Sequence, residues 1–428
     1  MQKPNDTKMK YSHFLLIIGW IISSLLPLHA QVTLEKCKEE ARCNFPLVKQ
    51  HDLIEKAALF NLSNAAKGYL PQITLSGKAS YQSDVTHLPI EMPGLEIPSL
   101  PKDQYQAVAE IYQSIWDGGE TQNRKKTARA TTEVERKKLE VDFYTLDERI
   151  DQIFFSILLL KEQLEQNSLL QDELKRTATQ VESYIRNGIA NDADLDAVQV
   201  ELIGTRQQEA NLRHSLSAYI GILSLFTGEK ITTETAFVIP APKAVIEEVN
   251  NRPELSWWEA QQQLYQQQKK NIEAQNRPRI GVFVQGGIGN PGLNMLKDKF
   301  SSYYVAGVRL NWNISKLYTR QNDRLLLDNQ IQRIENAREQ FLFNSRLDNM
   351  QKNQGLSALK EQMKDDDELI ERRIRIRKAA EAKVKEGTLT VTEMLRELTA
   401  ENAARSTRSL HAIQLLMKQY ELAHLFNQ

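Results

Sequence analysis

Histidines and cysteines are sparse after residue 30, and the spacing of the histidines fits no catalytic pattern. The histidines there show no HExxH pattern and no paired spacing suited to metal ligation; they are His51, His87, His214, His411 and His424. Gly286-Gly287-Ile288-Gly289 ends a predicted strand and lacks the following helix that a phosphate-binding loop needs. We therefore predict no catalytic residue, no metal and no cofactor, and we predict that the protein is not an enzyme.

Cys37 and Cys43 are the only cysteines of the chain. They lie six residues apart on a predicted helix and so point to different faces, which means that a mutual disulfide would require the helix to break. We favour the interpretation that both are small, buried packing residues.

The first thirty residues have the pattern of a secretory signal peptide. Lys3, Lys8 and Lys10 precede an apolar run at 14–28, and Leu28-His29-Ala30 offers a cleavage point. The run is shorter than the roughly 20 residues of a membrane-spanning helix, which favours cleavage over an uncleaved anchor. We predict a signal peptide at 1–30 and, because no apolar run of about 18 residues follows it, no later transmembrane helix.

The net charge of the remaining chain argues against one class of partner. Residues 1–30 contain three of the 55 basic residues and one of the 55 acidic residues, which leaves 52 and 54 and a net charge of −2. A nucleic-acid partner normally leaves a basic footprint, so we predict no nucleic-acid binding.

Apolar residues recur in steps of three and four over long stretches, as in helices that pack in coiled coils. The first series is Leu139, Phe143, Leu146, Ile150, Ile153, Ile157, Leu160 and Leu164, and the second is Leu195, Val198, Leu202, polar Thr205 and Glu209, Leu212, Leu216, Tyr219, Leu223 and Phe226. We predict helices at about 120–183 and 192–226, and by the same pattern at 317–385 and 392–426. A solvated two-helix hairpin would explain one such series, whereas four favour a larger helical assembly.

Four segments alternate apolar and polar residues with a period of two: 72–82, 104–113, 280–288 and 304–312. Over about ten residues this pattern is typical of a transmembrane β-strand, apolar toward lipid and polar toward a lumen. The alternative is a pair of amphipathic hairpins that cover the core of a soluble domain. Four strands cannot close a barrel in lipid, so spanning strands require oligomerisation. Two copies would supply eight strands, a barrel filled by side chains, and three would supply twelve and leave a lumen.

The second half of the chain repeats the first. Asn44-Phe45-Pro46 returns as Asn251-Arg252-Pro253, and Leu70-Pro71 returns as Arg277-Pro278, both 207 residues later. Each copy also has a shorter predicted helix before its strands, and these helices cover Pro46 to Gly68 and Pro253 to Asn276. The predicted domains are therefore a first repeat at 31–228, a linker at 229–250 and a second repeat at 251–428.

Several motifs together carry a family resemblance over essentially the whole chain after residue 30. They are Leu34-Glu35 with Asn44-Phe45-Pro46, Leu70-Pro71 at a strand entry, Ser114-Ile115-Trp116-Asp117-Gly118-Gly119, and the glycines Gly188 and Gly387 between long helices. In this order they resemble the TolC-type outer-membrane efflux proteins. One motif departs from the pattern, because Asn313-Ile314-Ser315-Lys316 lacks the glycine pair of its first-repeat counterpart.

The resemblance implies an α+β membrane protein with an internal duplication, long α-helical coiled-coil hairpins and four transmembrane β-strands per chain. It implies a homotrimer whose strands complete a twelve-stranded barrel in the outer membrane lipid of a Gram-negative bacterium, above a periplasmic helical tunnel. Such a channel is a passive export duct of a tripartite efflux or type I secretion system. Its implied partners are a periplasmic adaptor (membrane fusion) protein and an inner-membrane RND or ABC transporter.

The resemblance also implies a site at the two periplasmic turns. Each turn pairs a glycine with an acid six residues later, Gly188 with Asp194 and Gly387 with Glu393. The tips would contact the adaptor, and the acids could form a three-fold constriction that favours cations. Asn191 and Thr390 belong to the same polar clusters, and helix capping is the alternative interpretation. Some members of the family have a second acid three residues further on.

Three residues after Asp194 and Glu393 this chain has Ala197 and Arg396 in place of a second acid, which weakens the expectation of a strongly cation-binding gate. A second class of function stays open at this stage, namely a soluble periplasmic coiled-coil adaptor or structural protein. An adaptor would normally flank a single helical hairpin with a β-rich domain, whereas this chain places strands inside both repeats.

Overall fold

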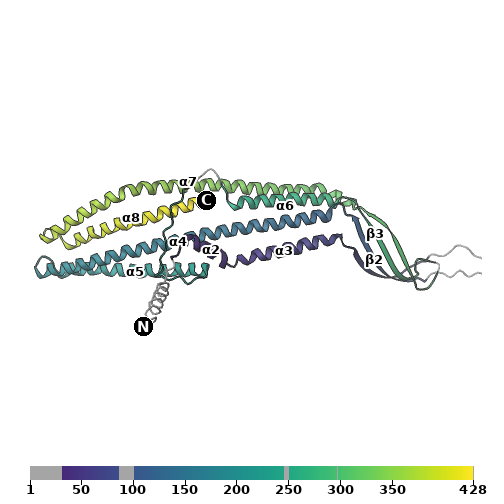
Figure 1. Cartoon of the computed structure of the whole chain (residues 1–428), viewed down its shortest axis with the longest axis horizontal. Helices are drawn as coiled ribbons and strands as arrows, with labels where there is room; N and C mark the ends of the chain where they lie inside the picture. The colour runs from purple at the N-terminus through teal and green to yellow at the C-terminus, as the bar shows by residue number, and fades with distance from the viewer. Residues whose placement is uncertain (1–30, 86–100, 245–249, 296, 428) are drawn as a thin grey trace, which may run out of the picture. The chain divides into compact units, whose positions relative to one another are not determined.

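A computed structural model describes residues 31–85, 101–244, 250–295 and 297–427. The predicted signal peptide lies outside these residues. The helices and strands, in chain order, are α2 (Leu34–Asn44), α3 (Val48–Ala66), β1 (Gln72–Tyr81), β2 (Asp103–Trp116), α4 (Glu120–Arg186), α5 (Asp192–Thr227), α6 (Pro253–Gln275), β3 (Arg279–Asn290), β4 (Ser301–Asn311), α7 (Leu317–Lys385) and α8 (Val391–Phe426), with short 3₁₀ turns at Lys67–Tyr69 and Ile314–Lys316 (Figure 1).

The chain forms two units. Of the described residues, the helical unit contains those within 31–45, 145–250 and 347–427, and the sheet unit contains those within 46–144 and 251–346. The order of a shorter helix, two strands and two long helices occurs twice along the chain. The repeat boundaries at 31–228, 229–250 and 251–428 stay predictions.

Four antiparallel strands form one sheet in the order β1-β2-β3-β4. The register places the predicted apolar positions side by side, since Ile73 pairs with Ile111, Ile111 with Val284, and Val284 with Ala306. This apolar face is open, and Leu75 on it is 81% exposed. The positions of all four strands are confirmed within a few residues, and the sheet has one bare apolar face.

The four long helices are also confirmed, with α4 three residues longer than predicted and α8 starting one residue earlier. Ile150 and Ile157 of the first heptad series are fully buried. The second series departs from the prediction at one point, because Tyr219 is exposed and its neighbour Ile220 is buried. A straight α-helix drifts by about 20° per heptad from a strict seven-residue repeat, which moves the buried stripe to the next residue.

A polar layer joins α4 to α5 where the second series has Thr205 and Glu209. The Asn167 side-chain amide donates to the Thr205 carbonyl at 3.2 Å, and Gln171 donates both to Asn167 and to Glu209 at 2.8 Å. Asn167, Gln171 and Thr205 are all buried. The polar members of the seam are therefore hydrogen-bonded partners inside the hairpin.

The shorter helices start differently from each other. Pro253 occupies the first turn of α6, as predicted. The prediction that α3 begins at Pro46 is wrong by two residues, because the amides of Lys49 and Gln50 bond three residues back and the helix proper begins at Val48. No described helix combines the length and the hydropathy that a bilayer-spanning helix needs.

The N-terminal segment docks on residues far along the chain. Val32 exchanges backbone hydrogen bonds with Ala236 and Val238 at 3.0 Å. The Asn44 amide donates to the carbonyls of Leu225 and Phe226, the last turn of α5. These contacts hold residues 32–44, called the N-terminal strap from here on, against the helical unit.

The strap shows that one cysteine prediction is wrong. Both cysteines are free, but only Cys37 is buried, whereas Cys43 is exposed. Cys37 lies on the same face of α2 as the buried Leu34 and Ala41. Cys43 is six residues further on, about 600° around the helix, and therefore faces solvent.

Candidate functional site

The two predicted tips are tight turns between long helices. Gly188 ends α4 with a φ of +71°, and Gly387 ends α7 with a φ of +72°. The next residue closes each turn with a hydrogen bond five residues back, from Ile189 to Tyr184 and from Thr388 to Lys383, both at 2.9 Å. This is the Schellman arrangement, in which glycine occupies the left-handed position without steric cost. Nothing lies near either glycine where a Cβ would be, so backbone conformation alone requires glycine there.

The predicted polar residues begin the returning helices as reciprocal caps. The Asp194 amide donates to the Asn191 side chain at 3.2 Å, and the Asn191 amide donates to the Asp194 carboxylate at 3.0 Å. Thr390 and Glu393 make the same two bonds at the start of α8, both at 3.2 Å. The hydrogen bond from the Thr390 backbone amide holds the pKa of Glu393 below its usual range. Both carboxylates are therefore anchored in the first turn of a helix by their caps.

The six predicted tip residues thus lie in two separate turns, both within the helical unit. Gly188, Asn191 and Asp194 form the α4–α5 turn. Gly387, Thr390 and Glu393 form the α7–α8 turn. The arrangement matches the capping interpretation in geometry, and it leaves both turn surfaces exposed.

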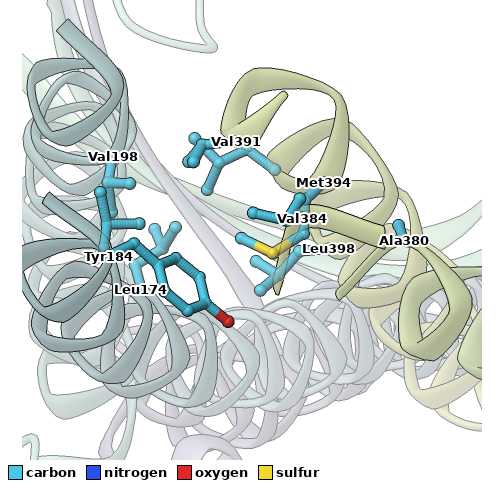
Figure 2. Packing of buried hydrophobic residues seen from close by; sticks show 10 residues of the cluster. Leu174, Tyr184, Val198, Ala380, Val384, Val391, Met394 and Leu398 are labelled. Carbon is cyan, nitrogen blue, oxygen red and sulfur yellow. The ribbon is translucent and has the colours of Figure 1, made fainter. Parts of the chain in front are cut away.

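An apolar cluster behind the turns joins the two hairpins. Figure 2 shows side chains of α4 and α5 facing side chains of α7 and α8. The buried members are Leu174, Val181, Tyr184, Val198, Ala380, Val384, Val391, Met394, Leu395 and Leu398. Each turn is therefore seated on a core shared by all four long helices.

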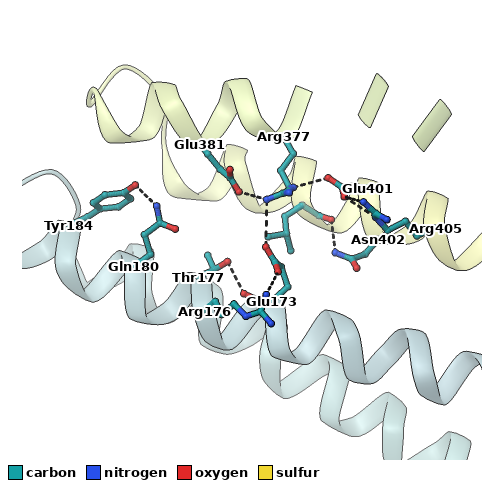
Figure 3. A network of polar contacts seen from close by, with 11 residues as sticks. Glu173, Arg176, Thr177, Gln180, Tyr184, Arg377, Glu381, Glu401, Asn402 and Arg405 are labelled. Atoms are coloured by element: carbon teal, nitrogen blue, oxygen red, sulfur yellow. Dashed lines mark hydrogen bonds and ion pairs between the residues drawn. The ribbon is translucent and has the colours of Figure 1, made fainter. Parts of the chain in front are cut away.

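An ion-pair network, which the sequence analysis did not identify, lies beside this cluster (Figure 3). Arg377 of α7 bonds Glu401 of α8 at 2.7 Å, approaches Glu173 of α4 at 3.5 Å and pairs with Glu381. Arg405 adds a second contact to Glu401 at 2.8 Å. The Arg377–Glu173 contact connects the two hairpins directly.

Glu401 is the buried member of this network, only 4% exposed. Burial alone would raise its pKa, but the hydrogen bonds from Arg377 and Arg405 hold the pKa below its usual range. A sequence signal for the network exists, because Arg377–Glu401 and Arg373–Glu397 both span 24 residues across the α7–α8 turn. Charges on long helices usually lie on solvated faces, so this spacing does not stand out without the structure.

The second chemically distinctive surface is the face of the sheet opposite the bare apolar one. The Arg309 guanidinium of β4 makes two hydrogen bonds to Glu110 of β2, at 2.6 and 2.9 Å, across the intervening β3. It also lies over the rings of Phe283 and Tyr112, at 4.4 and 5.9 Å from their centroids. A Cβ at Gly281 would lie 2.5 Å from the Tyr112 ring, so the glycine provides space for this stack. This face of the sheet is self-packed and polar.

Comparison with known proteins finds a family match that ends at residue 221, near the middle of the chain. The family model described as outer membrane efflux protein matches residues 38–221. The matched segment is less than half of the chain, and over it the chain is similar to outer membrane efflux proteins. A search of curated proteins finds no sequence match to this chain.

Solved structures extend the likeness of fold beyond the matched segment. The outer membrane protein VceC from Vibrio cholerae aligns with a TM-score of 0.66 at 12% identity, over 92% of this chain and 95% of its own. The outer-membrane channel OprN aligns with a TM-score of 0.70 at 12% identity, over 92% and 89%. The CmeC outer membrane channel of Campylobacter jejuni aligns at 0.67 and 11% identity, over 92% and 85%. Both halves of the chain therefore share the fold of these solved outer-membrane proteins.

Proposed function

We propose that three copies of this chain form a passive export duct through the outer membrane of a Gram-negative bacterium. The duct would be the channel component of a tripartite efflux or type I secretion system. It would accept cargo from a periplasmic adaptor protein and an inner-membrane transporter of the RND or ABC class. The family match at residues 38–221 and the likeness of fold to solved outer-membrane channels support the channel role, and the sheet supports the assembly.

The observation that carries the proposal is a sheet with two open edges and one bare apolar face. Among the described residues β1 and β4 each pair on one side only. Tyr304 and Leu75, on the apolar face, are 80% and 81% exposed. In lipid an unpaired strand edge is costly, whereas an apolar face is stabilised. Joining β4 of one copy to β1 of the next satisfies the edges, and lipid covers the apolar face.

Three copies suit a duct better than two. Two copies would supply eight strands, a number whose interior is filled by side chains. Three copies supply twelve strands and leave a lumen, toward which the polar face with Glu110 and Arg309 would turn.

Membrane fractionation and electrophoresis of unboiled protein test the duct. We expect the protein in the outer-membrane fraction as a heat-sensitive trimer that conducts ions in planar lipid bilayers. A soluble periplasmic monomer would overturn the proposal and favour a coiled-coil adaptor or structural protein.

We propose further that the exposed turns contact the adaptor, and that Asp194 or Glu393 forms a three-fold acidic constriction. The caps support this role because they fix each carboxylate at a defined place on its turn. Symmetry would bring three copies of each acid around one axis, and a ring of acids favours cations.

The test of the constriction must separate charge from capping. Glutamine can replace glutamate in a capping box, so Glu393→Gln removes the charge and keeps the cap, whereas Glu393→Ala removes both. Asp194→Asn serves in the same way for the first turn. We expect lower cation preference in the amide variants. Unchanged conductance and ion selectivity in both would reject the acidic ring.

A further inference from the structure

Four of the five charged residues within the sheet share one face. Strand register places Lys78 opposite Gln106, Glu110 opposite Gln285 and Arg309 opposite Gly281. Alternation along the strands then puts Lys78, Glu110, Arg279 and Arg309 on the self-packed polar face. The only charged residue on the apolar face is Asp103, at the first position of β2. Charge therefore separates the two faces sharply.

Three of these four charges are neutralised by partners. Glu110 and Arg309 form the two-bond pair across β3. Arg279 forms an ion pair with Glu120 at the start of α4. Lys78 is exposed and pairs with no acid in the described part of the chain. Lys78 is therefore the one charged residue of the polar face that has no ion-pair partner in the described part of the chain.

The surroundings of Lys78 leave its ammonium group available. Its neighbours on the same face of β1 are Ser76 and Ser80, both short and uncharged, and its partner across the strand pair is Gln106. Lys78 lies toward the Tyr81 end of β1, away from the end that follows α3. No carboxylate competes for it on the sheet, since Glu110 is already paired with Arg309.

We propose that Lys78 sets the ion preference of the barrel section, as a ring of three ammonium groups that favours anionic ions and cargo. This inference rests on the proposed trimeric duct. Rings of lysine or arginine are the usual means by which a pore favours anions. A unit charge about 10 Å from a passing ion in water changes the local ion concentration by about two-fold. Three such charges act together at low salt, where screening is weak.

The test measures the chloride-to-potassium permeability ratio of single channels in a dilute KCl gradient. We expect Lys78→Gln to lower the ratio by at least about two-fold, and Lys78→Glu to lower it further. Lys78→Arg should keep the ratio of the unmodified protein.

The matched control removes charge without changing the net charge of the face. The double variant Glu110→Gln/Arg309→Gln loses a neutral pair, so its permeability ratio should stay unchanged. Arg309→Gln alone leaves Glu110 unpaired and should shift the ratio toward potassium.

Lys78→Cys provides a second route that does not depend on how the charge variants fold. A positively charged thiol reagent on the assembled channel should restore the ratio, and a negatively charged one should reverse it. The same reagents applied to the protein without the Lys78→Cys substitution show any effect of modifying the exposed Cys43.

The outcomes separate this inference from the proposed function. A protein that forms no trimer and no conducting pore contradicts the duct itself. A conducting trimer whose permeability ratio is the same for every variant at Lys78 contradicts the role of Lys78 and is still consistent with the proposed duct.

Discussion

At the scale of the residue, burial decides how each of the two cysteines behaves. Cys37 is 1% exposed, and desolvation raises the pKa of its thiol to about 12. Cys43, near the end of the same helix, is exposed. The thiolate is the reactive form of cysteine, so burial suppresses Cys37 in two ways, by excluding reagent and by keeping the thiol protonated.

We predict that a thiol reagent at pH 8 modifies Cys43 rapidly and Cys37 only after unfolding. At that pH roughly one Cys37 side chain in 10⁴ would be ionised. Mass spectrometry of the trimer in detergent checks this, with Cys43→Ser as the control that should show no fast modification. Two rapidly modified thiols would mean that the N-terminal strap is not docked.

The tip residues show which parts of the candidate site can be predicted from neighbouring residues in the sequence. Gly188, Gly387, Asn191 and Thr390 are predictable because turns and caps depend on a few neighbouring residues, and the structure places all four in such roles. Glu401 is not predictable in this way. Its burial depends on contacts from Arg377, on the other side of the α7–α8 turn.

At the scale of the element, the network around Glu401 links helices through charge. The Glu401 pKa is lowered in the folded state, so folding stabilises its ionised form. That contribution is complete above the unfolded pKa of about 4.3 and is lost as pH falls through the lower folded value. The expected window of loss is therefore below about pH 4.

We predict that Glu401→Gln costs about 1–3 kcal/mol of stability at pH 7, because two arginines lose charge-assisted hydrogen bonds. The variant should also lose less stability than the unmodified protein on acidification from pH 5 to 3. Helix melting followed by circular dichroism measures both effects. Glu397→Gln removes the ion pair with Arg373, which is more exposed to solvent than the Arg377–Glu401 pair, and should therefore cost less stability. Equal losses for the two variants would contradict the network as described.

The long helices were predictable because seven-residue spacing over many turns is a strong local signal. Their pairing was not. Thr205 and Glu209 stand out as polar members of a seam, but their partners Asn167 and Gln171 follow only from the alignment of α4 with α5. The shift from Tyr219 to Ile220 has the same origin, since helix geometry accumulates a drift that a fixed repeat ignores.

At the scale of the whole molecule, the two faces of the sheet differ in polarity and are therefore suited to different environments, the apolar face to lipid and the polar face to water. Leu75 lies on the bare apolar face and Ser76, its neighbour, on the polar face. A charge on a lipid-facing strand position costs about 2–4 kcal/mol near the bilayer midplane, whereas the lumen side tolerates it.

We therefore predict that Leu75→Arg sharply reduces the amount of assembled trimer in the outer membrane and that Ser76→Arg does not. The pair is matched in position and in added charge. Quantification of unboiled trimer against total protein distinguishes them. Equal assembly of the two variants would contradict a lipid-facing apolar side.

Strand positions could be predicted because period-two alternation is local. The strand order could not, because β2 and β3 are joined through Ile111 and Val284, which are far apart in sequence. That central pairing turns two hairpins into one sheet, and no local pattern encodes it.

The N-terminal strap has a consequence for the timing of biogenesis. Lys36 of the strap contacts Glu229, 193 residues later, and the backbone partners of Val32 come later still. At usual synthesis rates of 5–20 residues per second, the strap waits roughly 10–40 s for the surface on which it docks. A segment synthesised early thus gains its full set of partners only after residues 229–238 have been made. Its docking reports completion of the first half of the polypeptide.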